Sequence, residues 1–308
     1  MEAVAQRTRR ARRPGVLEQR RFLAAALIAP AVLFILLLVG APLALSIYLS
    51  MTDATAGSLS GEWVGLDNFR SEWSDPNFRT ALRNTIVFTL LANAIVVGVA
   101  AVLAHFLIRD FRGKWFVRLL ILLPWAAPVA LSTIGWLWIY DSLFSVVNWV
   151  LKQLHLVDQF NPPQWLGEPN LALAAITSVH AWRLIPFATV IMIAGLASIP
   201  KEVDDAALVD GATGLRKLWF VTLPLQLPIA LIAVLFGIVF TATDMAVVYI
   251  LTRGGPFNST QMLPMWAFAT GIQSGELGLG AAIALYLLPV LAIVSVLMLL
   301  AARRVEVT

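Results

Sequence analysis

Long apolar runs alternate with shorter polar segments along this chain. Six runs are long enough to cross a bilayer, which takes about 20 residues of helix, and they cover residues 22–50, 80–108, 116–140, 171–199, 221–251 and 278–302. A helix satisfies its backbone polar groups internally, as a lipid environment requires. The pattern therefore predicts an all-α, polytopic membrane protein with six transmembrane helices.

The composition excludes a soluble enzyme of this size. Only 13% of the 308 residues are charged and 59% are hydrophobic, whereas soluble domains carry about 25% charged residues. The chain has no cysteine, which excludes disulfides, thiolate metal sites and cysteine nucleophiles.

Basic residues are distributed unevenly between the two sides of the membrane that six spans would create. With the N-terminus inside, 16 basic residues lie in the cytoplasmic segments 1–21, 109–118, 200–220 and 303–308, against five in the outside segments. Because cytoplasmic loops are enriched in Lys and Arg, we predict that both termini are cytoplasmic and that the chain lies in the cell membrane.

We expect three parts: a basic arm (1–21), a transmembrane domain (22–302) and a short tail (303–308). A basic arm can bind nucleic acid, but one placed directly before a spanning helix is typical of a cytoplasmic anchor. No nucleic-acid partner is therefore expected. The first apolar run is too long for the core of a cleaved signal peptide, so it is retained as a helix.

The outside segments are longer than turns. Residues 262–272 form an apolar piece too short to span, and we expect it to lie at the outer interface of the membrane or to dip into it. Within the spans, Pro124 and Pro128 are expected to loosen the third helix and Pro289 the sixth. Whether these prolines act as hinges or as tolerated kinks stays open.

No sequence motif indicates a catalytic, metal-binding or nucleotide-binding site on this chain. A GxxxxGK[ST] phosphate loop and the HExxH, CxxC and GxSxG patterns are absent from the sequence. The histidines His105, His155 and His180 are scattered. We expect no catalytic residue, no metal site and no cofactor on this chain, and hence no enzyme.

The polar segment between the fourth and fifth spans is the most informative one. Pro200 is predicted to take the first helical position, and Glu202, Asp204 and Asp205 lie at the positive end of that helix. Gly211 and Gly214 allow a left-handed turn, so that a second short helix can leave at an angle. Leu223-Pro224 would begin the fifth span. From the residues alone, this segment is either a surface for a partner or a decorated loop without one.

This segment carries a motif of a known family. It reads Asp205-Ala206-Ala207, three residues, Gly211, and later Val221-Thr222-Leu223-Pro224. The pattern resembles the E-A-A signature of permease subunits of binding-protein-dependent ABC importers, with Asp in place of the usual Glu.

Four further stretches resemble the carbohydrate branch of that family, the maltose-type permeases. They are GLDNF at 65–69, ALRNT at 81–85, LTRGGP at 251–256 and GLGAAIALYL at 278–287. The resemblance runs from about residue 22 to the C-terminus. It implies the fold of a type I ABC importer permease.

The resemblance also implies partners. The cytoplasmic segment would be a coupling helix seated in a separate ATPase subunit, present in two copies that carry ATP and Mg. A second permease chain would complete a heterodimer within membrane lipid, and an extracytoplasmic sugar-binding protein or lipoprotein would deliver a sugar, such as the disaccharides trehalose or maltose. The residues expected to couple to the ATPase are Glu202, Asp205, Ala206, Ala207, Asp210, Gly211, Gly214, Leu223 and Pro224.

Polar groups inside spans are costly and face the interior by default. Trp182, Arg183 and Asp244 are such candidates for a substrate path, and Arg183 and Asp244 either pair with each other or make separate interhelical hydrogen bonds. Counting from the family motifs adds the expected sugar contacts Leu184, Phe187, Gly237, Phe240 and Thr241. A role of Phe187 and Phe240 in helix packing alone stays open.

Two other classes of membrane protein fit the sequence less well. An ion-coupled secondary transporter would show repeat-related broken helices and several midplane charges, and only Arg183 and Asp244 fit that pattern. A membrane-embedded enzyme would need a catalytic cluster, which the sequence lacks.

Overall fold

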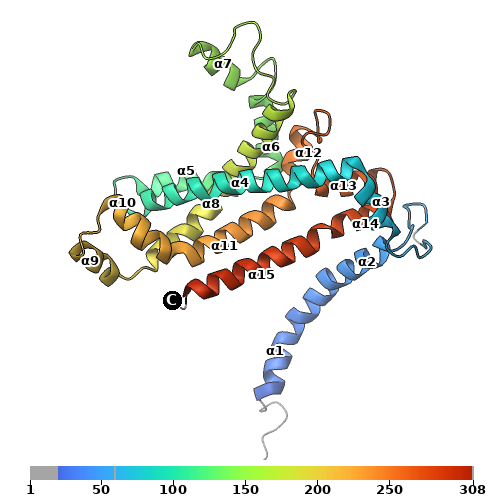
Figure 1. The fold of residues 1–308 in the computed structure, drawn as a ribbon, viewed down its shortest axis with the longest axis horizontal. Coiled ribbons are helices and arrows are strands. Elements are labelled where there is room, and N and C mark those ends of the chain that lie inside the picture. Colours follow the sequence, from blue (N-terminus) through green and yellow to red (C-terminus); the bar gives the residue numbers. More distant parts are fainter. Residues whose placement is uncertain (1–19, 59, 307–308) are drawn as a thin grey trace, which may run out of the picture. The chain divides into compact units, whose positions relative to one another are not determined.

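The computed structural model describes residues 20–58 and 60–306. Most of the predicted arm (1–21) and the last two residues of the tail therefore lie outside the described residues. The described chain forms helices and two isolated β-bridges, without a strand, and the prediction of an all-α fold is confirmed (Figure 1). By its internal contacts the chain divides into two units, 1–48 and 49–308.

The first unit contains one long apolar helix. It consists of α1 (Arg20–Ile35), the π-helical turn η2 (Leu36–Gly40) and most of α2 (Ala41–Ser50). Residues Leu23–Ser50 are long and apolar enough to cross a membrane, as predicted for the first span. Pro42 is the second residue after η2, and a proline that cannot donate to the helix ladder commonly loosens the turn before it.

The second unit holds the remaining helices. They are α3 (Asp67–Ser74), α4 (Pro76–Ile108), α5 (Lys114–Ala126), α6 (Val129–Ile139), α7 (Val146–Gln153), α8 (Pro169–Ala197), α9 (Lys201–Val209), α10 (Gly214–Lys217), η3 (Leu218–Thr222), α11 (Leu223–Ala242), α12 (Ala246–Leu251), α13 (Leu263–Phe268), η4 (Ala269–Gln273), α14 (Leu277–Leu285) and α15 (Leu287–Glu306).

Three long helices form the centre of this unit. Helix α4 packs against α8 and α11, and α11 packs against α15, as Figure 1 shows. Small residues let these backbones approach, including Ala100, Ala181 and Ala188 in one buried cluster and Ala104 and Ala233 in another. Transmembrane helices associate through close contact between small residues, because lipid tails are as apolar as the helices and the hydrophobic effect does not drive the helices together.

The third predicted span, 116–140, is broken. Helices α5 and α6 are bent by 97° at the short break after Ala126. Pro128 adopts an extended conformation as the N-cap of α6, and its missing N–H prevents a continuous ladder. The described residues therefore contain five separate candidate spans, and six only if this bent pair counts as one.

The limits of the fifth predicted span, 221–251, need correction. A continuous helical run starts earlier, at Gly214, and it ends at Ala242. Residues 243–245 separate it from α12, and Asp244 starts α12 by accepting a hydrogen bond from the Val247 N–H at 3.1 Å. The sixth span is interrupted only at Tyr286, three residues before Pro289, whose ring disturbs the carbonyl one turn earlier.

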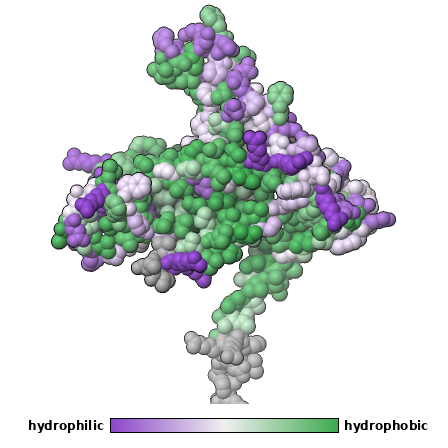
Figure 2. Space-filling view, viewed as in Figure 1, coloured by the Kyte–Doolittle hydropathy of each residue, from purple (hydrophilic) through white to green (hydrophobic). Residues whose placement is uncertain are grey.

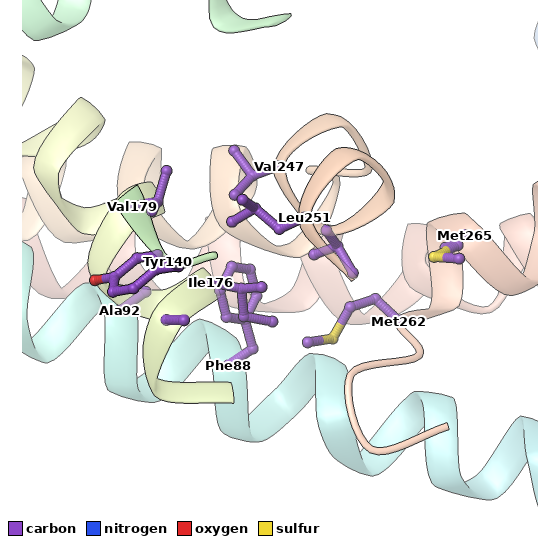
Figure 3. Packing of buried hydrophobic residues seen from close by; sticks show 11 residues of the cluster. Phe88, Ala92, Tyr140, Ile176, Val179, Val247, Leu251, Met262 and Met265 are labelled. Atoms are coloured by element: carbon purple, nitrogen blue, oxygen red, sulfur yellow. The ribbon is translucent and has the colours of Figure 1, made fainter. Parts of the chain in front are cut away.

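A second apolar cluster joins α4, α6, α8 and α12 to the segment before α13 (Figure 3). Phe88 and Ile176 lie at its centre, with Val247 and Met262 beside them. Met262 and Leu263 are fully buried. The start of the piece 262–272 therefore packs into the unit, and its predicted position at the outer interface of the membrane stays a prediction.

Helix α3, which begins within the GLDNF stretch, packs on α14. The Tyr286 hydroxyl donates to the Phe69 carbonyl at 2.7 Å, and the buried Glu72 carboxylate accepts from Trp266 Nε1 at 2.9 Å. Burial raises the pKa of Glu72, and the Trp266 hydrogen bond opposes that shift.

The surface of the second unit is mainly apolar. Figure 2 shows a hydrophobic band across its middle, with hydrophilic side chains gathered around α7 and near the two ends of the long helices. Such a band is what lipid-facing helices require.

The crossing of η4 and α14 predicts a sensitive glycine. A Cβ on Gly280 would lie 2.7 Å from the Gly271 nitrogen and 3.0 Å from the Ala267 carbonyl oxygen. We expect Gly280→Ala to cost about 1–3 kcal/mol of stability through overpacking, measured as a lower unfolding temperature in detergent. Gly98→Ala in α4 is the matched control, because nothing lies within 4 Å of its Cβ position. Equal unfolding temperatures for the two variants would contradict the close crossing.

Candidate functional site

The connection between α8 and α11 is a structured element. Helix α9 begins after Pro200, which is its N-cap and not its first helical residue as predicted. Glu202 and Asp204 lie in the first turn, where the helix dipole favours negative charge.

Helix α9 ends in a complete Schellman motif. The Ala212 N–H donates to the Ala207 carbonyl at 2.8 Å, and the Gly211 N–H donates to the Leu208 carbonyl at 3.1 Å. Gly211 has φ +71° and Gly214 has φ +55°, a region that favours glycine. The predicted left-handed turn at these glycines is confirmed.

The next helix starts at Gly214 and runs through α10 and η3 into α11. Leu223 and Pro224 are the first residues of α11, as predicted, but the helical run that leads into α11 already begins at Gly214 and passes through the π-helical turn η3. An ion pair of 2.8 Å between Lys217 Nζ and Asp204 Oδ1 connects α10 to α9. The pair is partly exposed and lies between the two helices that the glycine turn joins.

The predicted coupling residues differ in exposure. Glu202, Asp205, Ala206, Asp210, Gly211 and Gly214 are exposed, Leu223 is half-buried and Pro224 is exposed on α11. Ala207 is buried against its own chain, so only Ala206 of the alanine pair presents its side chain outward.

Two apolar residues at this site were missed in the sequence. Leu208 is 56% exposed and Val209 is 88% exposed, at the end of α9. The available signal was the apolar pair directly before the glycine turn, on a short helix otherwise rich in acids. Exposed apolar side chains beside exposed carboxylates suit a protein–protein contact.

A polar cluster joins the middle of α8 to the break after α11. Arg183 forms an ion pair with Asp244, which confirms the pairing alternative. His180 Nδ1 lies 3.1 Å from the same carboxylate, and His180 Nε2 lies 2.9 Å from the Thr241 hydroxyl. His180 is fully buried. Its membership of the cluster was missed, although it lies one helical turn before Arg183.

Four predicted path residues lie inside the chain. Leu184, Gly237, Thr241 and Asp244 are buried. A Cβ on Gly237 would meet Asn93 Cγ at 3.0 Å, and Asn93 Nδ2 donates to the Val234 carbonyl at 3.0 Å. Because Gly237 has no side chain, the polar side chain of Asn93 on α4 can lie against α11.

Two further predicted path residues, Phe187 and Phe240, keep exposed surface and form part of an aromatic cluster. Phe187 stacks on Trp125 with ring centroids 4.8 Å apart, and its ring lies 5.5 Å from that of Phe240. Phe236 lies 5.8 Å from Phe187. Trp125 and Phe236, which the sequence analysis missed, extend this aromatic surface over α5, α8 and α11. Trp182 contacts Trp136, at 5.5 Å.

A comparison with protein families matches residues 94–307 to the family described as binding-protein-dependent transport system inner membrane component. The chain belongs to this family.

Relatives of this transport family support the assignment over most of the chain. The sulfoquinovosyl glycerol transport system permease protein SmoG of Agrobacterium fabrum is 33% identical over 268 residues, covering 86% of this chain and 85% of the relative. The trehalose/maltose transport system permease protein MalF of Thermococcus litoralis is 30% identical over 223 residues, covering 72% and 74%. The sn-glycerol-3-phosphate permease protein UgpA of Agrobacterium fabrum is 29% identical over 259 residues, covering 83% and 86%.

The fold agrees with a solved transporter. A chain of the bacterial ABC transporter that imports the acidic polysaccharide alginate superimposes with a TM-score of 0.78 at 18% identity, covering 93% of this chain and 96% of that chain. The protein is therefore a multi-pass membrane permease of an ABC importer. It is a transport component and not an enzyme, and the family decides against an ion-coupled secondary transporter.

The buried ion pair generates a prediction for this permease. Removing one partner of a buried pair costs about 3–5 kcal/mol, because it leaves an uncompensated charge. We expect Arg183→Met and Asp244→Asn each to lower the unfolding temperature strongly, and the double variant to recover most of the loss. An Asn at 244 can still accept from the Val247 N–H, so α12 keeps its start. Additive losses in the double variant would show that the two side chains do not stabilise each other.

Proposed function

We propose that this permease forms half of the translocation path for a neutral sugar and is driven by a separate ATPase seated on α9. One observation carries the proposal: α9 presents exposed apolar and acidic side chains between two candidate spans, in a rigidly capped connection.

The geometry suits transmission of force. The Schellman motif and the Lys217–Asp204 ion pair hold α9 to α10, and α10 continues through η3 into α11. Helix α11 packs on α4, α8 and α15. A displacement of α9 would therefore move α11 with its neighbours.

The ATPase would be a different chain that binds ATP and Mg, since this sequence carries no phosphate loop. The larger number of Lys and Arg residues in the segments expected inside than in those expected outside supports a cytoplasmic position of α9, where ATP is found. Two ATPase copies and a second, different permease would complete the importer.

A soluble sugar-binding protein or lipoprotein would dock on the other side of the membrane. The segment that carries α7 supplies exposed apolar side chains there, among them Leu143 at 86% and Phe144 at 83% exposure. Apolar side chains beside polar ones are suited to such a contact.

The substrate would be a neutral sugar, such as the disaccharides trehalose or maltose. Phe187, Phe236, Phe240 and Trp125 offer the flat apolar faces that sugar rings stack on. Arg183, the cation closest to this surface in the sequence of α8, is already neutralised by Asp244. Several relatives carry names of anionic substrates, sulfoquinovosyl glycerol and sn-glycerol-3-phosphate. In this chain, the arginine of the polar cluster is paired and is not available to an anionic substrate.

The coupling role predicts the effect of a charge at the end of α9. Val209→Asp should weaken assembly with the ATPase by about tenfold or more, since exposed apolar anchors dominate such contacts. The measurement is the amount of ATPase that co-purifies with the permease, together with ATP-driven uptake. Val209→Leu is the matched control and should behave as wild type. Normal assembly and uptake for Val209→Asp would contradict an ATPase contact at α9.

The substrate path predicts the effect of removing an aromatic face. Phe187→Ala should lower the trehalose- or maltose-stimulated ATP hydrolysis of the reconstituted importer by roughly 2–10-fold. Phe106→Ala is the control, because Phe106 is an exposed aromatic residue of α4 that contacts Phe111 instead. Wild-type hydrolysis in Phe187→Ala would reject this surface as the path. Stimulation of the wild-type importer by sn-glycerol-3-phosphate alone would reject a neutral substrate.

A further inference from the structure

A groove of about 930 Å³ lies at the end of the second unit where α9 and α10 are found. This α4–α10 groove is lined by Gly98, Ala101, Val102, His105, Ile108, Arg109, Leu196, Ile199, Asp204, Gly214, Leu215, Lys217, Leu218, Trp219, Thr222 and Leu223. Its volume is at the upper end of the range of about 300–1,000 Å³ for ligand sites.

One part of the groove is apolar and elongated. The residues from α4 recur at helical spacing from Gly98 to Ile108 and form one stripe along the helix axis. Leu215, Leu218 and Leu223 line the groove from the α10–α11 run. An extended hydrocarbon chain fits such a surface, whereas a small polar solute does not.

The polar groups at the groove are mainly cationic. Arg109 and Lys217 line it with a single carboxylate, Asp204, which is already paired with Lys217 at 2.8 Å. Among the described residues, Arg109 has no ion pair, and its side chain is exposed. The groove therefore has an uncompensated positive charge beside its apolar stripe.

An interfacial aromatic residue marks the level of the groove. Trp219 lines it and is 64% exposed. Tryptophan prefers the boundary between hydrocarbon and headgroups. The apolar stripe on α4, the cationic side chain of Arg109 and the interfacial Trp219 together match an amphiphilic molecule with an anionic headgroup.

We propose that the α4–α10 groove binds one anionic phospholipid of the cytoplasmic leaflet, with its phosphate at Arg109 and Lys217 and an acyl chain along the α4 stripe. Basic pockets between transmembrane helices on the cytoplasmic side are suited to anionic headgroups. The proposal rests on the proposed function for the cytoplasmic position of α9. The bound lipid would bridge α4 to the α10–α11 run that carries α9.

The test uses the full-length protein reconstituted with its partner subunits in nanodiscs. A photoactivatable phosphatidylglycerol is compared with a phosphatidylcholine that has the same acyl chains, and the labelled peptides are identified by mass spectrometry. We expect labelling within residues 98–109 and 214–223 by phosphatidylglycerol, in competition with unlabelled phosphatidylglycerol but not with inorganic phosphate.

Two variants and one matched control address the groove itself. Arg109→Gln should weaken phosphatidylglycerol labelling about five-fold, as expected for one basic residue at a membrane surface. Val102→Trp should block the apolar stripe, on which Val102 is 69% exposed. Arg83→Gln removes another exposed arginine, which lies toward the opposite end of α4, and should leave labelling unchanged.

Three outcomes would overturn the proposal. They are equal labelling by the two lipids, labelling outside the two peptides, and a groove shielded by a protein segment that cross-links to it in the assembled importer. The readout does not depend on uptake, so a failure of coupling at Val209 is seen separately.

The side of the membrane is tested independently with Asp210→Cys, because the chain has no other cysteine. Labelling of this cysteine from outside would reject the orientation for both proposals.

Discussion

The Arg183–Asp244 ion pair is the interaction on which the arrangement of the second unit depends. An ionic group buried among apolar helices must find a partner, because lipid and hydrocarbon side chains cannot solvate it. Asp244 meets this requirement three times: it pairs with Arg183, contacts His180 and caps α12. The carboxylate thereby connects α8 to the point where α11 ends. It also sets the position of the last turns of α11, which carry Phe236 and Phe240.

Helix α11 also connects α9 to the aromatic surface, the two sites to which we assign the proposed function. Helix α11 begins in the run that holds α9 through the Lys217–Asp204 pair, and it ends at the polar cluster and the aromatic surface. Between these ends it packs tightly, because Gly237 leaves room for Asn93 and Gly195 lies against Ile229. A helix held at both ends and closely packed along its length transmits displacement rather than absorbing it.

Hydropathy was sufficient to predict the membrane class and the number of apolar segments, since span length depends on bilayer thickness alone. It could not locate the end of α11 at Ala242, because that end depends on which carboxylates find partners in three dimensions. The prolines of the third span indicated a loosened helix there, but not its bend of 97°. The glycine turn at Gly211 was predictable from backbone sterics. The inward direction of Ala207 and the outward direction of Val209 were not, since the motif spacing is silent about how α9 rotates on its axis.

The family motif and the physical reading of α9 assign different weights to the same residues. The motif emphasises the small pair Ala206 and Ala207, but Ala207 is buried and its carbonyl closes the Schellman motif with Ala212. A larger side chain at Ala207 would therefore disturb the cap of α9 before it reached any partner. Loss of function at that position can reflect the shape of the helix end, whereas Val209 presents almost its whole side chain outward. Substitutions at the exposed residues of α9 therefore test the proposed contact with a partner, whereas substitutions at Ala207 test the geometry of the helix end.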